Sequence, residues 1–241
     1  MAQHGKDTVV LHNQYNITSS LDSTSIDRSI AVLDTTVFGQ DSRTYTPGQK
    51  DGTISVEGFA DPAAVGIDSI LSGSFGSTAT YVTVSLGQTA GSNAYLIDSI
   101  ENQYTTTSSV TDLVRISGEY QTAQDGICAG VLLLPVTTAT TTATGASYDR
   151  SAVEITGSVG YCHVTAASGT SPTLDVSIQI DDNSGFTSPT TLITFSQVGA
   201  INVMRIESTT TVVAADQYVR AAYTLGGTDP SFTFAVAWAP R

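Results

Sequence analysis

Three histidines, a Cys-His pair and an acidic turn are the residues that could carry chemistry in this chain. His4, His12 and His163 lack the short spacing, such as His-x-x-x-His, that a metal site needs. Cys162 precedes His163 in a predicted strand, so their side chains point to opposite faces. This geometry predicts a core thiol beside a surface imidazole rather than a nucleophilic pair. The turn Asp181 to Gly185 lacks the distal glutamate of an EF-hand calcium loop, so we expect a hairpin turn there. The sequence therefore predicts no catalytic residue, no metal ligand and no cofactor.

The composition favours a chain built from β-strands. Charged residues make up 13% of the 241 residues, which is about half of the usual fraction of roughly 25%. Ser, Thr and Gly take their place; Thr favours half-buried strands, whereas Gly and Ser favour turns. The chain is long enough for two domains, each with its own core. We therefore predict an all-β protein with two domains.

The charge balance is strongly acidic, with nine Lys and Arg against 22 Asp and Glu and a net charge of −13. A basic stripe that could neutralise phosphates is missing from the sequence, which disfavours tight binding of nucleic acid. The acidity can serve solubility alone, or it can repel a polyanion. Residues 1–126 carry five basic and 14 acidic side chains, a net charge of −9, and the remainder carries four and eight, a net charge of −4. The N-terminal part is therefore expected to present the more acidic surface.

The cysteines and the apolar segments limit where the protein is made. Cys128 and Cys162 fall in different predicted domains, so we expect two free thiols rather than a disulfide framework. The N-terminus has no basic start followed by an apolar run, so a secretory signal is not predicted. No apolar stretch approaches the roughly 18 residues that a membrane span needs. We expect synthesis in a cytoplasm and no contact with a membrane.

The N-terminal half is predicted to contain strands and one short helix. A polar segment rich in turn residues, Gly39 to Gly52, reads as a long loop around Pro47-Gly48. Asp61 as a cap and Pro62 as the first helical residue predict a helix that ends at Gly73. The expected strands are Val9–Asn13, Asn16–Leu21, Ile30–Phe38, Thr53–Phe59, Thr80–Leu86, Ala94–Glu101, Leu113–Tyr120 and Gly126–Val136.

The C-terminal half reads as an antiparallel sandwich that follows a linker. Thr137 to Ser147 contains only small residues, which predicts a linker or a loose edge strand between a domain of residues 1–136 and a domain of residues 148–241. Turns are expected at Asp181 to Gly185 and at Gly226 to Pro230. The expected strands are Ser158–Ala167, Thr173–Ile180, Thr191–Phe195, Asn202–Glu207, Tyr218–Thr224 and Ser231–Trp238.

An ordered set of short motifs in the first 130 or so residues resembles one branch of the tail tube proteins of long-tailed bacteriophages. The set comprises a His-Gly-Lys-Asp opening at His4 to Asp7, a Thr-Thr-x-Phe-Gly run at Thr35 to Gly39, Arg43, the Pro47-Gly48 pair, and Gly58 to Asp61 at the end of the next strand. The resemblance implies a tail-tube-like β-sandwich or barrel with one short helix. The second part, which follows that domain, is similar to an antiparallel β-sandwich of related phage structural proteins.

The resemblance also implies a mechanism of assembly. In that family, subunits form rings that are six-fold or pseudo-six-fold, and the rings stack into a tube that conducts double-stranded DNA without binding it specifically. A long loop between two N-terminal strands reaches the neighbouring ring. The interface residues that the resemblance assigns to this loop are Gly39, Gln40, Asp41, Arg43, Tyr45, Pro47, Gly48 and Lys50. The implied partners are further copies of the chain, tape-measure proteins and tail-completion proteins, and the implied location is the tail of a virion.

Two other classes of function stay open at the level of the sequence. One is a capsid decoration protein or another tail-associated protein. The other is a carbohydrate-binding module, in which aromatic side chains of the second sandwich would stack on sugars, although such rings more often lie in a core. The aromatic residues in question are Tyr148, Tyr161, Tyr218, Tyr223 and Trp238. An enzyme is the least favoured class, because no cluster of carboxylates or histidines marks a cleft.

Overall fold

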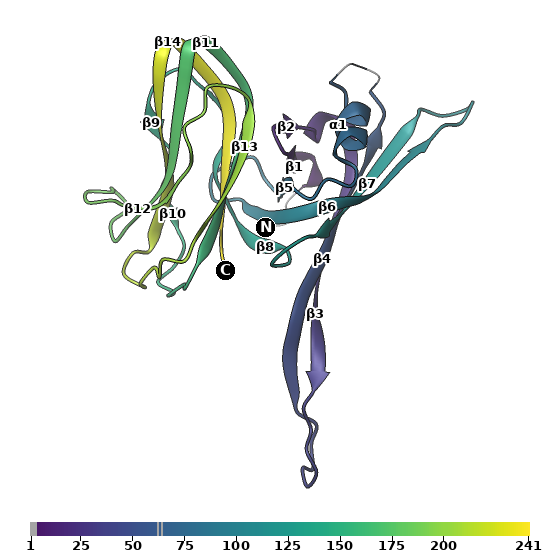
Figure 1. Cartoon of the computed structure of the whole chain (residues 1–241). Coiled ribbons are helices and arrows are strands. Elements are labelled where there is room, and N and C mark those ends of the chain that lie inside the picture. Colours follow the sequence, from purple (N-terminus) through teal and green to yellow (C-terminus); the bar gives the residue numbers. More distant parts are fainter. Residues whose placement is uncertain (1–3, 62, 64) are drawn as a thin grey trace. The chain divides into compact units, whose positions relative to one another are not determined.

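The structure is a computed structural model that describes residues 4–61, 63 and 65–241, and its described elements are mainly antiparallel strands, as predicted (Figure 1). The chain packs as two compact units whose segments alternate along the sequence. Unit 1 comprises the segment up to Thr18 and residues 81–96 and 128–241, and unit 2 comprises residues 19–80 and 97–127. The expected division into residues 1–136 and 148–241 therefore differs from the packing, because strands distant in the sequence pair with each other.

Unit 1 contains an antiparallel sheet assembled from both ends of the chain. Residues Asn93 to Leu96 of β6 pair with β8, and β8 pairs with β14, while β1 pairs with β5 and β2. The bounds of these strands are β1 Val9–His12, β2 Tyr15–Asn16, β5 Thr80–Ser85, β6 Asn93–Thr107, β8 Cys128–Ala139 and β14 Tyr218–Pro240. A 3₁₀ helix, Gly5–Asp7, precedes β1.

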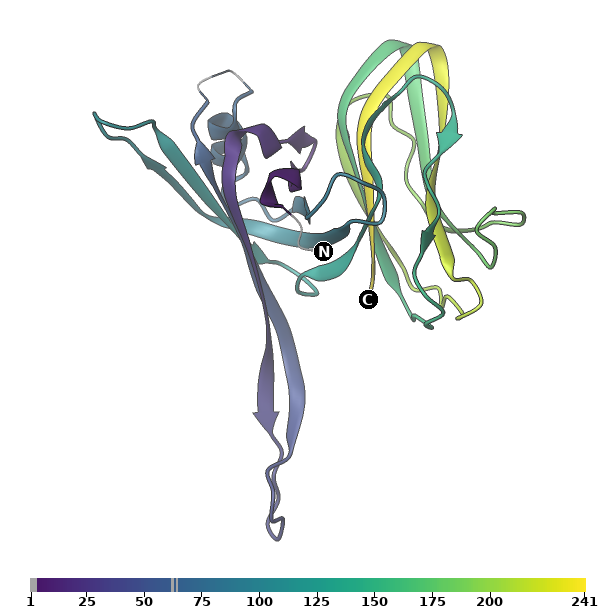
Figure 2. The same cartoon turned by 180° about the vertical axis from the view of Figure 1, so that it is seen from behind.

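Two very long strands form both layers of the sandwich in unit 1. β11 (Ser158–Asp181) has 24 residues and pairs with the 23-residue β14 along almost its whole length. Each expected pair of strands, including the pair around the turn at Gly226 to Pro230, is thus one continuous strand. The register shifts between Val164 and Thr173, where Gly169 has φ +121°, and such irregularities bend a strand without ending it. Figures 1 and 2 show both strands folding over together from one layer to the other.

Alternation along the two long strands builds the core of unit 1. Cys162, Val164, Leu174 and Val176 of β11 all lie in one buried cluster with residues of β14. The neighbouring Val159 and Tyr161 face the other way, into a second buried cluster with Leu11 and Leu96. The first half of β11 is therefore buried on both faces. The remaining strands are β9 Ala143–Thr144, β10 Tyr148–Asp149, β12 Thr190–Thr194 and β13 Asn202–Ser208.

The expected linker, Thr137 to Ser147, is part of this sheet. Thr137 to Ala139 continue β8 and pair with β14, and β9 pairs with Ala222 and Tyr223 of the same strand. Small side chains suit these positions, because Gly145 already lies within about 3.5 Å of backbone oxygens of β8 and β14 where a Cβ would be. Of the two expectations for this segment, a linker or a loose edge strand, residues 137–139 and 143–144 form the strand, so low complexity did not mark flexibility there.

Unit 2 is a four-stranded antiparallel sheet with one helix. The sheet has the order β3 (Leu21–Asp34), β4 (Tyr45–Phe59), β7 (Arg115–Thr122) and the second part of β6. The helix α1 (Ile67–Ser74) starts later than predicted, since Gly66 is its N-cap; Pro62 lies outside the described residues. A short 3₁₀ helix, Thr18–Ser20, precedes β3.

Replacing two glycines of unit 2 with alanine should change the free energy of unfolding in opposite directions. A Cβ on Gly58 would lie 2.0 Å from the carbonyl oxygen of Ser20, whereas a Cβ on the helical Gly73 meets nothing within 4 Å. We expect Gly58→Ala to lower the free energy of unfolding by roughly 1–3 kcal/mol through overpacking. Gly73→Ala should raise it by up to about 1 kcal/mol, because alanine favours a helix. Urea unfolding followed by circular dichroism measures both, and equal stabilities of the two variants would contradict this packing.

Candidate functional site

The long β3–β4 hairpin is the most prominent feature of unit 2. Figures 1 and 2 show it extending away from α1 and from the rest of its sheet. Its connecting loop comprises residues 35–44, because β3 continues to Asp34 and β4 begins at Tyr45. The predicted loop from Gly39 to Gly52 is therefore too long at its C-terminal end. Gly39, Gln40, Asp41 and Arg43 lie in the loop, and the other four predicted interface residues, Tyr45, Pro47, Gly48 and Lys50, lie in β4.

A β-bulge explains why Pro47 and Gly48 lie in a strand although they resemble a turn. Ile30 pairs with Lys50 and Val32 pairs with Pro47, so two residues of β4 oppose Ala31 alone. A bulge relaxes the ladder, and proline and glycine are tolerated at such positions. A Cβ on Gly48 would lie 3.1 Å from the Cβ of Ala31, so glycine also provides the room for this local close approach.

The outer part of the hairpin, which we call the ribbon (residues 27–51), has no layer over either face. Every residue from Asp27 to Asp51 is exposed except the half-buried Gly48. The root of the hairpin differs, because Ile54 and Val56 are fully buried there and β7 pairs with β4 from Thr53 to Phe59. β7 ends at Thr122, which is why the sheet narrows to two strands at this point. A two-stranded ribbon is only marginally stable in water by itself.

One face of the ribbon continues the apolar pattern of the core into solvent. Ile26 lies opposite the buried Ile54, and Ile30, Val32 and Tyr45 lie further out on the same face. This face also carries Arg28, Lys50 opposite Ile30, and Asp34 opposite Tyr45. We call Ile30, Val32, Tyr45 and Pro47 the apolar face. Ile30 is 45% exposed, Val32 62% and Tyr45 55%. Exposed apolar side chains rimmed by charged ones, as here, are typical of surfaces that bind another molecule.

The loop at the tip of the hairpin is held by its own polar side chains. Asp34 Oδ1 accepts hydrogen bonds from the backbone N–H of Thr36, at 2.9 Å, and from its hydroxyl, at 2.5 Å. These bonds lower the pKa of Asp34. Thr36 Oγ1 in turn accepts from the N–H of Thr44, which closes the loop. Phe38 is fully exposed within this braced loop, so an apolar ring is presented at the end of the hairpin.

The open edge of the hairpin is the second surface that could bind a partner. Among the described residues, β3 pairs with β4 alone, so its other edge presents unpaired backbone groups over Leu21 to Asp34. Edge strands are templates for pairing with another chain unless charges protect them. Asp22 at the start of the edge pairs with Arg115 at 2.7 Å. A pocket of about 500 Å³ adjoins the root of the hairpin, between Ile30 and Lys50 on one side and residues 122–126 on the other.

Unit 1 contains a pair of buried histidines that the sequence did not reveal. His12 and His163 are both almost inaccessible to solvent. His163 Nδ1 donates to the carbonyl oxygen of Asn13 at 2.6 Å, and its Nε2 lies 2.8 Å from Thr83 Oγ1 and accepts from it. Burial lowers the pKa of His163 to about 4, and burial together with the charge of His163 lowers the pKa of His12 to about 4. The prediction of a surface imidazole was wrong, because that face of β11 is covered as well.

The Cys162 side chain lies on the opposite face of β11 from His163, as predicted, and is fully buried as a free thiol. Burial raises its pKa, so the reactive thiolate is disfavoured. Cys128 is half-buried and does not form a disulfide with Cys162. Asp181 accepts hydrogen bonds from the N–H groups of Asn183 and Ser188, which confirms a turn between β11 and β12.

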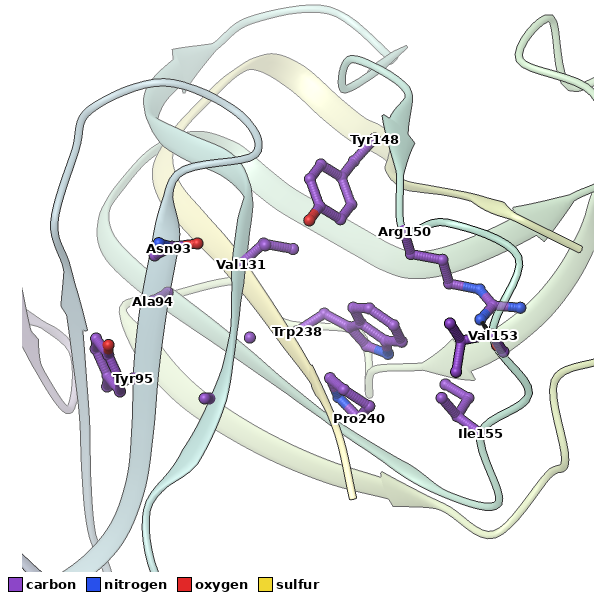
Figure 3. A pocket seen from close by; sticks show the side chains of 12 residues that line it. Asn93, Ala94, Tyr95, Val131, Tyr148, Arg150, Val153, Ile155, Trp238 and Pro240 are labelled. Atoms are coloured by element: carbon purple, nitrogen blue, oxygen red, sulfur yellow. Dashed lines mark hydrogen bonds between the residues drawn. The ribbon is translucent and has the colours of Figure 1, made fainter. Parts of the chain in front are cut away.

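Unit 1 also contains a pocket of about 470 Å³ lined by aromatic and apolar side chains (Figure 3). Trp238 is 2% exposed, and its Nε1 has no hydrogen-bond partner among the described residues. Arg150 donates from Nη2 to Val213 O at 2.7 Å and from Nε to Asp216 O at 2.9 Å. Tyr148 lies across the pocket from these two side chains. Of the other aromatic residues predicted as candidates for sugar binding, Tyr161 and Tyr223 are buried in the core.

Within residues 4–61, 63 and 65–241, no group of three or more His, Cys, Asp or Glu side chains could hold a metal ion. The same residues include no helix that is long and apolar enough to cross a membrane.

No protein-family model and no curated protein matches the chain. Among solved structures, it is similar to a chain of the virion of a native gene transfer agent particle, with a TM-score of 0.44 and 16% identity over 52% of this chain and 98% of that chain. It is also similar to a chain of the PVC sheath-tube complex of an extracellular contractile injection system in the extended state. The TM-score is 0.44, with 14% identity over 54% of this chain and 92% of that chain. A third similar structure is the SPP1 Dit protein, described as a hub adsorption apparatus of phages that infect Gram-positive bacteria, with a TM-score of 0.37 and 9% identity over 96% and 98%.

Proposed function

We propose that the protein is a structural subunit of a virion tail and that its copies form rings which stack into a DNA-conducting tube. The apolar face of the ribbon carries this proposal. Ile30, Val32 and Tyr45 extend the pattern of Ile26 and Ile54 beyond the reach of their own sheet. Burying these exposed apolar side chains against another copy of the chain would favour association.

The open edge of β3 supports pairing between subunits within a ring. An unpaired strand edge is removed when sheets of adjacent copies join into a closed barrel, since closure leaves no free edge. The tip of the hairpin, with Phe38 exposed, would contact a different surface of a copy in the next ring. Such head-to-tail contacts repeat without closing, and they generate a filament. No covalent chemistry is required, and the proposal assigns no enzymatic activity, metal or cofactor to the chain.

The charge of unit 2 suits a wall along which DNA slides. Unit 2 carries 13 acidic and four basic side chains, a net charge of −9, against nine and five in unit 1, a net charge of −4. Carboxylates that face the channel of such a tube repel a polyanion at short range, so the DNA passes through without being bound. We further propose that tape-measure and tail-completion proteins bind the ends of the tube. Synthesis in the host cytoplasm precedes assembly into the virion tail.

Negative-stain electron microscopy of the purified, concentrated protein tests the proposed function. We expect stacked rings of uniform diameter, and we expect double-stranded DNA at low salt to show no measurable binding to them. Discrete particles at every concentration would contradict the tube, and tight binding of DNA would contradict the repelling wall.

A carbohydrate-binding function is the second candidate, and the pocket beside Trp238 is the observation that favours it. A buried indole N–H without a hydrogen-bond partner among the described residues and a tyrosine ring in the same pocket are features that bind sugar hydroxyls and faces. Retention on immobilised sugar columns distinguishes the two candidates. A protein that is retained and stays monomeric supports the second function, whereas unretained stacked rings support the first.

A further inference from the structure

A carboxyl group is enclosed in the interior of unit 2, where strands β6 and β7 meet helix α1. Glu101 of β6 is 0% exposed and lies opposite Tyr120 of β7, which is also 0% exposed. Gly118 lies beside the carboxyl group, because a Cβ there would meet Glu101 Oε1 and a methyl group of Leu71 at the ordinary contact distance of 3.5 Å. The helix thus covers a side chain that is usually charged and usually faces water.

The hydrogen bonds around this carboxyl group fit its neutral form. Glu101 Oε2 contacts Ser74 Oγ at the end of α1, and Ser74 Oγ also lies 3.1 Å from the carbonyl oxygen of Ile70 and 3.2 Å from that of Leu71. A hydroxyl group has one hydrogen. If Glu101 carries a proton, it donates to Ser74, and Ser74 can donate to the helix carbonyls. If Glu101 is ionised, Ser74 must donate to it and leave those carbonyls.

Among the residues that the structure describes, the groups around Glu101 provide no compensating positive charge. From α1, Asp68 accepts a hydrogen bond from the hydroxyl of Tyr104, which belongs to β6. From β7, Tyr120 faces Glu101, and the carboxylate raises the pKa of that phenol further above its ordinary value. From β4, the facing side chain is the apolar Val56. Glu101 Oε1 has no hydrogen-bond partner among the described residues, so an ionised carboxylate would be poorly satisfied.

We propose that Glu101 is a proton-dependent latch, which holds α1 on the sheet when it is protonated and releases the helix when it ionises. The backbone strengthens the connection at the same point, since Gly76 N–H donates to the carbonyl oxygen of Glu101 at 2.9 Å. The helix depends on such anchors, because it has eight residues and its N-cap, Gly66, offers no side-chain hydrogen bond. Ile67 and Leu71 are its other buried contacts. The latch does not depend on the proposed function, and it operates in the isolated subunit.

The direction of the pH dependence follows from burial. Burial raises the pKa of Glu101 from 4.5 to about 7, and the hydrogen bond that Ser74 can donate to the ionised carboxylate offsets only part of this shift. Because the pKa of Glu101 is higher in the folded protein, its bound proton stabilises the docked helix, and this contribution is complete below about pH 4.5. That contribution is lost as the pH rises toward 7, so α1 opens more often in neutral than in mildly acidic solution.

Amide hydrogen exchange of the full chain, corrected for the intrinsic exchange rate, tests the latch. Between pH 5.5 and 8.5 the opening constant of the amides in residues 70–76 should rise about 30-fold, which follows from the two pKa values. Glu101→Gln keeps the size of the side chain and a donor but cannot ionise, so its exchange should be independent of pH. Glu57→Gln changes an exposed glutamate of β4, is the matched control and should retain the full pH dependence.

The proposal is overturned if α1 of the unmodified protein shows no pH dependence, or if Glu101→Gln shows the same dependence as the unmodified protein. Because the variant could fail to fold, a carbon-13 NMR titration of the Glu101 carboxyl group in the unmodified protein provides a second measurement. A pKa near 7 supports the latch, and a pKa near 4.5 overturns it.

Discussion

Replacing Ile30, Val32 and Tyr45 with threonine should abolish assembly and leave the subunit folded. These side chains are about half exposed or more in the subunit, so little of their apolar area is lost from its core. If a neighbouring copy buries them, each should contribute about 1.5 kcal/mol to association. The triple variant should therefore associate roughly a thousandfold more weakly, at tenfold per 1.4 kcal/mol. The critical concentration for ring or tube formation, measured by sedimentation, reports the effect.

A matched control uses the opposite face of the same ribbon. Ser29 and Thr46 lie on that face, so Ser29→Asn combined with Thr46→Gln changes polar side chains without touching the apolar face. The control should assemble like the unmodified protein, and both variants should unfold at the same temperature as it does. Normal assembly of the triple threonine variant would show that the apolar face is not an interface between copies.

Mild acid should destabilise unit 1 through its buried histidine pair. His12 and His163 have pKa values of about 4 in the folded chain against 6.5 ordinarily, so the unfolded chain binds more protons between these values. Their contribution to stability is complete above pH 6.5 and is lost as the pH falls toward 4. Protonation of His163 Nε2 also removes the acceptor of the Thr83 hydroxyl. At pH 4.5 the combined loss should be roughly 5 kcal/mol relative to pH 7.

The single tryptophan makes this effect measurable, because Trp238 lies in unit 1. Urea unfolding followed by its fluorescence should give a free energy of unfolding that falls steeply from pH 7 to pH 4.5. In His12→Gln the fall should be about half as large, because one titrating group remains. His4→Gln changes an exposed histidine and should keep the full fall. An unchanged free energy of unfolding between the two pH values in the unmodified protein would refute the role of the pair.

The sequence was a good guide to the type of element and a poor guide to its extent. Alternation of apolar and polar residues predicted strands at most places where the structure has them, and Gly73 lies one residue before the end of the helix. Pro47-Gly48 and Gly226 to Pro230 were predicted as turns, because proline and glycine usually interrupt strands. In the structure both segments lie in irregular but continuous strands. A bulge depends on the partner strand, which a local pattern does not contain.

The candidate sites were harder to predict because they depend on contacts between distant residues. Glu101 and Ser74 are 27 positions apart, and nothing in either local sequence indicates that a glutamate is buried. His163 meets Asn13 only because β1 and β5 lie in the same unit as β11. Part of the apolar face could have been found from the sequence, since Ile26, Ile30 and Val32 lie at even positions of one strand and therefore share a face. The rest of the apolar face was not predicted, because Tyr45 and Pro47 were assigned to a loop.

The alternation of the two units along the chain has a consequence for the order of events during translation. Unit 2 is complete once residue 127 has left the ribosome, whereas unit 1 still lacks residues 128–241, which supply β8, β11 and β14. Until β8, β11 and β14 have been synthesised, β1 and β5 can therefore pair at most with each other and with β2. Because domains tend to fold as units during synthesis, a ribosome that stops early releases a chain with one finished unit and an unfinished sheet. Removal of the C-terminal strand would thus deprive the first strands of their completed sheet rather than trim an independent domain.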